Sequence, residues 1–176
     1  MTTMTVTQAQ GRRNVLPLIQ IIGGSLLLAL TSQLVIRFSF TPIPVAIHPT
    51  MAVLLGVLLG PKRGMAAVAL YLLEGACGLP VFAGGMAGLP YMLGPTGGYL
   101  VAFAPAAFFG GWLAQRMRTA PAILLGHLPL YLLGPLYLSL FISWGHVLMA
   151  GVLPFLPGCV IKSLVAASAV RYFRAA

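Results

Sequence analysis

Lys162 is the one basic residue that lies inside a long apolar segment rather than at the end of one. An ionisable residue within a membrane helix is costly and usually faces a cavity or a charged partner. The single acidic residue, Glu74, could pair with it, and so could an anionic ligand. The alternative is that the lysine stem extends to the membrane interface. We favour a cavity-facing lysine, because Lys162 follows the helix-breaking pair Pro157-Gly158.

Thr96 and Tyr99 stand in the sequence Gly94-Pro-Thr-Gly-Gly-Tyr. The glycines would let a ligand approach the backbone, and the hydroxyl groups could hydrogen-bond it. A simple turn before a helix would have the same composition. Several aromatic residues nearby could wall an apolar pocket, and each could equally anchor at the interface or pack in the core: Phe38, Phe40, Phe82, Tyr91 and Tyr99.

The sequence contains no set of residues suited to catalysis. His48, His127 and His146 are scattered, and neither an HExxH nor a GxSxG motif occurs. One acid in the whole chain excludes paired-carboxylate chemistry. The Walker A motif of ATPases is also absent. We therefore expect a protein that is not an enzyme and that uses no metal or cofactor.

The composition is that of an integral membrane protein. Of 176 residues, 60% are hydrophobic and only 6% are charged, and the mean hydropathy is +1.01. A soluble domain carries about 25% charged residues. The net charge of +9 would suggest a nucleic-acid partner in a soluble protein, but here the basic residues separate apolar segments. We read them as determinants of membrane orientation and expect no nucleic-acid partner.

The apolar segments predict an all-α fold of six transmembrane helices, with outer loops that cap or re-enter the bundle. One domain, residues 15–176, would follow a cytoplasmic tail, residues 1–14. Between the helices, three irregular Gly/Pro-rich stretches must be buried or line a cavity, because lipid cannot satisfy their backbone groups. These stretches are Thr41–His48, Gly78–Gly85 and Gly94–Tyr99. The predicted helices are Leu16–Ile36, Thr50–Leu59, Met65–Cys77, Gly97–Gln115, Ala120–Ile142 (bent at Gly134-Pro135) and Leu153–Phe173.

Eight of the ten basic residues fall in alternate connections of this six-helix arrangement: Arg12, Arg13, Lys62, Arg63, Arg116, Arg118, Arg171 and Arg174. Positively charged connections stay in the cytoplasm. Both termini are therefore expected to be cytoplasmic, and the irregular stretches to lie on the outer side.

Six motifs, in order, resemble the BioY family, the biotin-binding S components of energy-coupling-factor (ECF) transporters. The resemblance covers residue 16 to the C-terminus and implies a six-helix fold that captures biotin at the outer side. The motifs are Phe40-Thr-Pro-Ile-Pro-Val, Leu59-Gly-Pro-Lys-Arg-Gly, Tyr71-Leu-Leu-Glu-Gly-Ala, Gly78-Leu-Pro-Val-Phe-Ala-Gly-Gly, Leu93-Gly-Pro-Thr-Gly-Gly-Tyr and Pro154-Phe-Leu-Pro-Gly.

The resemblance also implies a substrate site. The family usually has Pro-Gly-Asp-x-x-Lys at the start of its last helix, so Lys162 matches, whereas Cys159 replaces the aspartate that would contact the ureido ring of biotin. Met86 stands where some members have asparagine, and His48 where many have glutamine. The candidate substrate-binding residues are Lys162, Cys159, Tyr99, Thr96, Met86, Gly85, His48, Phe40 and Tyr91.

The implied function is biotin uptake across the bacterial cytoplasmic membrane. The implied partners, besides membrane lipid, are a coupling protein and two ATPases, although the chain could also work alone. Ser25 and Ala29 share a helix face and match the small-residue face that meets the coupling protein, or they serve internal packing. A biotin precursor or another small carboxylate is an alternative ligand, because Cys159 replaces the aspartate. A scaffold subunit that binds no solute is an alternative of another class, and a homo-oligomer is left open.

Overall fold

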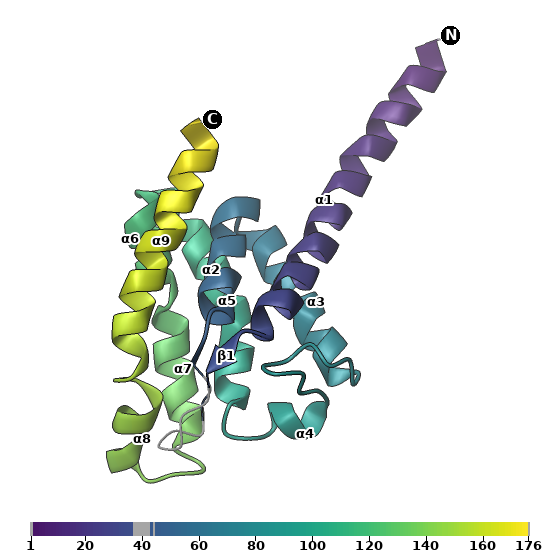
Figure 1. The fold of residues 1–176 in the computed structure, drawn as a ribbon. Helices are drawn as coiled ribbons and strands as arrows, with labels where there is room; N and C mark the ends of the chain where they lie inside the picture. The colour runs from purple at the N-terminus through teal and green to yellow at the C-terminus, as the bar shows by residue number, and fades with distance from the viewer. Residues whose placement is uncertain (1, 37–42, 44, 176) are drawn as a thin grey trace.

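The structure is a computed structural model, and it describes residues 2–36, 43 and 45–175. Both termini lie at one end of a helical bundle, and α4 and α8 lie at the opposite end (Figure 1). The described residues form nine α-helices and two short strands: α1 Thr2–Ser32, β1 Val35–Ile36, β2 Val45–Ala46, α2 His48–Leu59, α3 Pro61–Ala76, α4 Leu89–Met92, α5 Gly97–Leu113, α6 Thr119–Gly126, α7 Leu128–Leu138, α8 Trp144–Gly151 and α9 Phe155–Ala175.

The predicted all-helical membrane fold is confirmed. Three helical stretches are long and apolar enough to cross a membrane: Val15–Ser32, Thr119–Leu138 and Trp144–Tyr172. Two further apolar helices, α2 and α5, are shorter than a full span. By length and composition, three of the six predicted spans are therefore clear.

Glycines let three of the helices pack almost backbone to backbone. A Cβ atom added to Gly56 of α2 would lie 1.8 Å from the carbonyl oxygen of Ala107 in α5. One added to Gly64 of α3 would lie 2.4 Å from the Cα of Gly56, and one added to Gly111 of α5 would lie 2.4 Å from the oxygen of Gly56. Small residues at such crossings permit close approach in membranes. The centre of the bundle is therefore the contact of α2, α3 and α5.

Helix α1 packs mainly on α3 and exposes much of its surface. It begins at Thr2 and ends at Ser32, so its backbone is helical through most of the predicted tail and stops before the predicted end at Ile36. Leu28 and Ser25 are fully buried, whereas Leu26 and Leu30 are exposed. A helix that is buried along one face only has its other face free to meet lipid or another protein.

The fifth predicted helix is divided in two at His127. His127 lies between the last residue of α6, Gly126, and the first residue of α7, Leu128. The first turn of α7 contains Pro129. The Nδ1 atom of His127 donates to the carbonyl oxygen of Ile123 at 2.8 Å, and Nε2 accepts from the Thr50 hydroxyl at 3.2 Å. Helix α7 continues through Pro135, so the chain breaks seven residues before the predicted bend. The His127 side chain thus gives a hydrogen-bond donor to the Ile123 carbonyl oxygen, one of the groups that a helix end leaves without a backbone partner.

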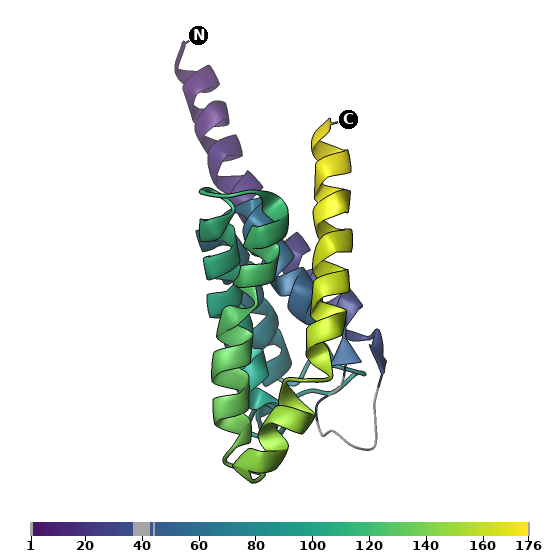
Figure 2. The ribbon, with the colours of Figure 1, turned by 90° about the vertical axis from the view of Figure 1, so that its left-hand side faces the viewer.

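The segments at the end away from the termini are irregular but tied down. Strands β1 and β2 form an antiparallel pair with Val35 opposite Ala46. Helix α7 leads through α8 into α9 at this end (Figure 2). The segment Leu79–Thr96, which we call the cap, contains α4, and its Phe82 is fully buried. Phe82 packs against Tyr71 and Tyr91, with ring centroids 5.6 Å apart in both pairs.

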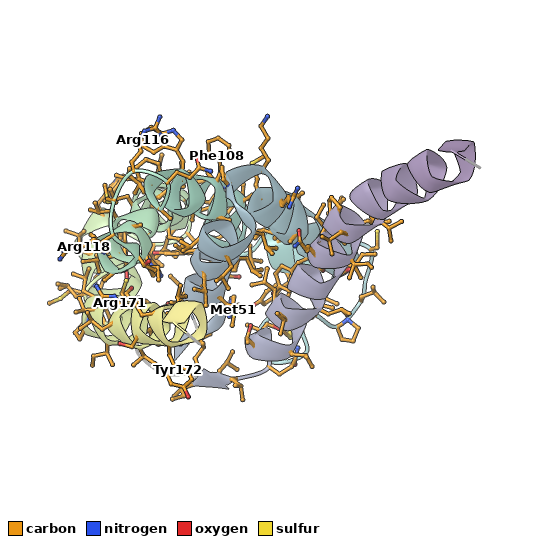
Figure 3. All side chains as sticks on the ribbon, turned by 90° about the horizontal axis from the view of Figure 1, so that it is seen from above. Met51, Phe108, Arg116, Arg118, Arg171 and Tyr172 are labelled. Carbon is orange, nitrogen blue, oxygen red and sulfur yellow. The ribbon has the colours of Figure 1, made fainter. Side chains whose placement is uncertain are left out.

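The opposite end carries basic side chains. Figure 3 looks onto the end where both termini lie and shows Arg116 and Arg118, which join α5 to α6, and Arg171 near the end of α9. All three are exposed. The Arg116 guanidinium lies 3.8 Å from the ring centroid of Trp112. This end therefore combines positive charge with an aromatic anchor, as membrane interfaces do.

Candidate binding site

One pocket of about 600 Å³, counting the space at its open mouth, lies where the strand pair, the cap and four helices meet. Its walls are mostly apolar and aromatic, and its polar side chains are few. Concave sites with mostly apolar and aromatic walls and a few polar groups are typical of small-molecule binding. The lining residues are Ile43, Ala46, His48, Pro49, Ala83, Tyr91, Thr96, Tyr99, Leu100, Phe103, His127, Leu130, Tyr131 and Phe155.

Four of the predicted site residues line this pocket: His48, Tyr91, Thr96 and Tyr99. They come from the start of α2, from α4 and from the start of α5, so segments far apart in sequence converge here. Thr96 immediately precedes α5, so it lies at the N-terminus of that helix. The irregular stretches thus do line a cavity.

Tyr99 contributes its ring to the pocket, but its hydroxyl hydrogen is already used. The hydroxyl donates to the carbonyl oxygen of Gly151 at 2.8 Å and so links α5 to α8. An added Cβ at Gly134 would lie 2.3 Å from the Tyr99 ring, so the small residue makes room for it. A ligand could therefore use the Tyr99 hydroxyl oxygen only as a hydrogen-bond acceptor.

Lys162 lies beside the pocket, half-buried on α9. Its Nζ atom donates to the carbonyl oxygen of Ala46, a lining residue, at 2.8 Å. An ammonium group has three N–H donors, so two remain for another acceptor. Lys162 is therefore bonded to a lining residue but is not itself one of the residues that line the pocket.

The Lys162–Glu74 pair that the sequence left open is not formed. Glu74 instead accepts a hydrogen bond from the Ser25 hydroxyl at 2.5 Å, between α3 and α1. Lys162 is bonded to Ala46. The two charged side chains therefore make different contacts, and Glu74 does not neutralise Lys162.

Cys159 is buried on α9, one turn before Ser163, and its sulfur lies 4.0 Å from the Ser163 hydroxyl oxygen. A thiol is a weak hydrogen-bonding group. Cys159 does not itself line the pocket.

The remaining predicted residues lie elsewhere. Gly85 and Met86 belong to the cap but do not line the pocket, and Met86 is exposed. Phe40 lies outside the described residues. Ser25 is fully buried against α3, and Ala29 is partly buried against the core, so the Ser25 side of α1 faces inward.

Sequence reasoning missed three residues that shape the pocket: Phe103, His127 and Tyr131. In the sequence His127 is one of three scattered histidines, and its distance from His48 along the chain gives no sign that both residues line one cavity. Phe103 packs edge-on against His48 with ring centroids 5.0 Å apart. Pro129, two residues after His127, is the signal that could have marked the helix break and its inward histidine.

Comparison with known proteins places the chain in a family. The model of the BioY family matches residues 3–176. A probable biotin transporter BioY from Pyrococcus horikoshii is 38% identical over 143 residues, which cover 81% of this chain and 88% of that protein. The biotin transporter BioY of Rhizobium etli is 35% identical over 146 residues, covering 75% of this chain and 78% of the other.

The fold also matches a solved structure. The S-component for biotin from an ECF-type ABC transporter superposes with a TM-score of 0.85 and 28% sequence identity, over 94% of each chain. This chain therefore belongs to the BioY family and has the S-component fold.

Proposed function

We propose that this chain binds biotin in the pocket described above and carries it across the cytoplasmic membrane. The similar proteins of this family are named as biotin transporters, not as enzymes. The observation that carries the proposal to this chain is the pocket itself, an apolar and aromatic cavity, with the Lys162 ammonium bonded to the carbonyl oxygen of its lining residue Ala46. Biotin combines an apolar chain, a sulfur-containing ring fused to a polar ureido ring, and a single carboxylate.

In the proposed arrangement, the ligand carboxylate takes the donors that Lys162 has free beside Ala46. Charge-assisted hydrogen bonds of this kind are about twice as strong as neutral ones. The apolar chain and ring then lie against Tyr91, Tyr99 and Phe103. Thr96 adds a hydroxyl at the same wall, and Gly85 and Met86 act only as parts of the cap.

We also propose the finer topology: six spans, with α6 and α7 together as the fifth span and α8 with α9 contributing the sixth. The pocket then opens to the outer side and both termini are cytoplasmic. Support comes from Arg116, Arg118 and Arg171, which lie at the end that carries the termini (Figure 3). The positive-inside rule places that end in the cytoplasm.

Partners are proposed from the solved relative, which is described as part of an ECF-type ABC transporter. On this basis, a coupling protein and two ATPase subunits would energise transport, since this chain has no Walker A motif. Ser25 donates to Glu74 and is buried, which favours internal packing for that residue. Ala29 is only partly buried and stays in the proposed partner surface.

A second candidate ligand is a biotin precursor or another small carboxylate. It is favoured by Cys159, a free thiol at the position where the family usually has a carboxylate. Competition for bound biotin by desthiobiotin and by simple fatty acids distinguishes the two candidates. A scaffold that binds no solute would have no use for a formed pocket with a charged wall.

Uptake of labelled biotin by cells that lack their own importer tests the proposed function. We expect accumulation when the chain is expressed with a coupling module, and a comparison without the module shows whether the chain works alone. Membranes must be checked for equal amounts of protein. No uptake under either condition would overturn the transport proposal.

A further inference from the structure

One face of α5 carries an exposed stripe that ends in an arginine. Most of this helix is buried, but Val101, Phe108 and Trp112 are 54%, 39% and 37% exposed. Arg116, in the connection that follows the helix, is exposed as well. Phe108, Trp112 and Arg116 follow one another at intervals of four residues, the spacing that places residues on one helix face. Figure 3 shows Phe108 and Arg116 on the same side of the bundle.

The Arg116 side chain is oriented by an aromatic ring. Its guanidinium carbon lies 3.8 Å from the ring centroid of Trp112, a distance at which the ring attracts a cation. The Trp112 ring is itself stacked on Phe109, with centroids 5.9 Å apart. The guanidinium makes no hydrogen bond to the described residues, whereas that of Arg63 donates to Gln20 at 3.1 Å. Arg116 is therefore held in place while its N–H donors stay free.

No acidic side chain in the described part of the chain pairs with this arginine. The sequence has ten basic residues and one acidic residue, Glu74, which accepts a hydrogen bond from Ser25 between α3 and α1. Arg118, two residues after Arg116, is also exposed, so this connection carries two positive charges without a carboxylate partner. At the end of a membrane-spanning bundle, the phosphates of lipid headgroups are anions close at hand.

We propose that Arg116 and Trp112 bind the headgroup of an anionic phospholipid in the leaflet at the end that carries the termini. A guanidinium has a planar fork of donors that fits a phosphate bidentately, and it can stack on an aromatic ring at the same time. Tryptophan is enriched at the level of the headgroups. One acyl chain then lies along the exposed side chains of Phe108 and Val101.

The charge of this site predicts a preference among lipids. A net negative headgroup balances the two arginines, whereas the ammonium group of a zwitterionic headgroup finds no acidic partner here. Neither Arg116 nor Trp112 lines the pocket described above. The lipid site is therefore separate from the biotin proposal and does not depend on it.

The fluorescence of Trp112 tests the site in the purified full-length chain. The chain has two tryptophans, and Trp144 lies in α8 at the opposite end of the bundle (Figure 1). In a Trp144→Phe background, Trp112 is thus the one tryptophan. The protein is reconstituted into vesicles of phosphatidylcholine and phosphatidylglycerol, in which one lipid at a time carries bromine on its acyl chains. Bromine quenches a tryptophan in contact with it, so the two titrations give the relative affinity of the lipids at Trp112.

We expect phosphatidylglycerol to be preferred at Trp112 by roughly fivefold, the effect of about one basic residue at an anionic surface. Arg116→Gln should abolish the preference, because glutamine is polar but uncharged. Arg171→Gln is the matched control, since it removes the same charge from an exposed arginine of α9 at the same end (Figure 3) and should leave the preference unchanged. In a Trp112→Phe background, Trp144 should show no such preference.

Thermal unfolding shows whether each variant is folded. Equal affinity of the two lipids at Trp112 would overturn the inference. An unchanged preference in Arg116→Gln, or an equal loss in Arg171→Gln, would overturn it too, because the charge of the whole end would then attract the lipid. If neither brominated lipid quenches Trp112, protein such as a second copy covers this face, and the inference is wrong. Each of these outcomes leaves the proposed function standing.

Discussion

Gly75→Ala should distort the cap and weaken the pocket, although Gly75 does not line it. The added methyl carbon would lie 2.1 Å from Cζ and 2.2 Å from Cε1 of Phe82. Non-bonded carbons prefer separations of about 3.5–4.0 Å, so the ring must move by roughly 1.5 Å. Phe82 is fully buried between Tyr71 and Tyr91 and has little room to do so.

The cost follows from that overlap. Overpacking a closed core usually destabilises by about 1–3 kcal/mol, and we expect Gly75→Ala to fall in this range. Biotin affinity should fall too, because Ala83 and Tyr91, the neighbours of the displaced ring in sequence and in space, line the pocket. Thermal unfolding of the purified protein and equilibrium biotin binding measure the two effects.

Gly23→Ala is the matched control. It makes the same change within a helix, but an added Cβ there meets nothing within 4 Å. A partial rescue should come from combining Gly75→Ala with Phe82→Leu, because the smaller side chain relieves the overlap and the two effects are then not additive. If Gly75→Ala behaves like Gly23→Ala in both assays, the account of the cap is wrong.

Other substitutions test other parts of the structure. Lys162→Met should weaken biotin roughly tenfold or more and leave the uncharged biotinamide almost unaffected, since only the carboxylate pairs with the ammonium; equal losses in competition binding would refute this. Tyr99→Phe keeps the pocket ring but loses the hydroxyl bond to Gly151, so thermal unfolding should show a loss of about 1 kcal/mol with little change in biotin affinity. Gly56→Leu should prevent assembly of the folded bundle, because even a Cβ there would collide with the Ala107 carbonyl oxygen; a normal melting curve would contradict it.

The order of the helices follows from the sequence, but their internal breaks do not. Apolar runs bounded by Gly, Pro and basic residues identify α2, α3 and α5 within a few residues of their ends. The division at His127 depends on a side chain that bonds Ile123 in the preceding turn and Thr50 on another helix. A contact between distant segments leaves no local pattern in the sequence. Gly134-Pro135 is a strong local signal for a bend, but α7 continues through it in the folded bundle.

The pocket is predictable only in part for the same reason. Irregular backbone in a membrane protein must line a cavity, and this argument correctly brings His48, Thr96 and Tyr99 to one site. It cannot tell which hydroxyl is already used inside the protein, as that of Tyr99 is by Gly151. It also misses Tyr131, an inward-facing residue in an evenly apolar helix whose pattern gives no preferred face.

Equilibrium binding of labelled biotin to the purified wild-type chain tests the central claim most directly. The account predicts saturable binding of one biotin per chain, displaced by unlabelled biotin and strongly reduced in Lys162→Met. A protein that unfolds cooperatively on heating yet shows no saturable biotin binding would contradict the account.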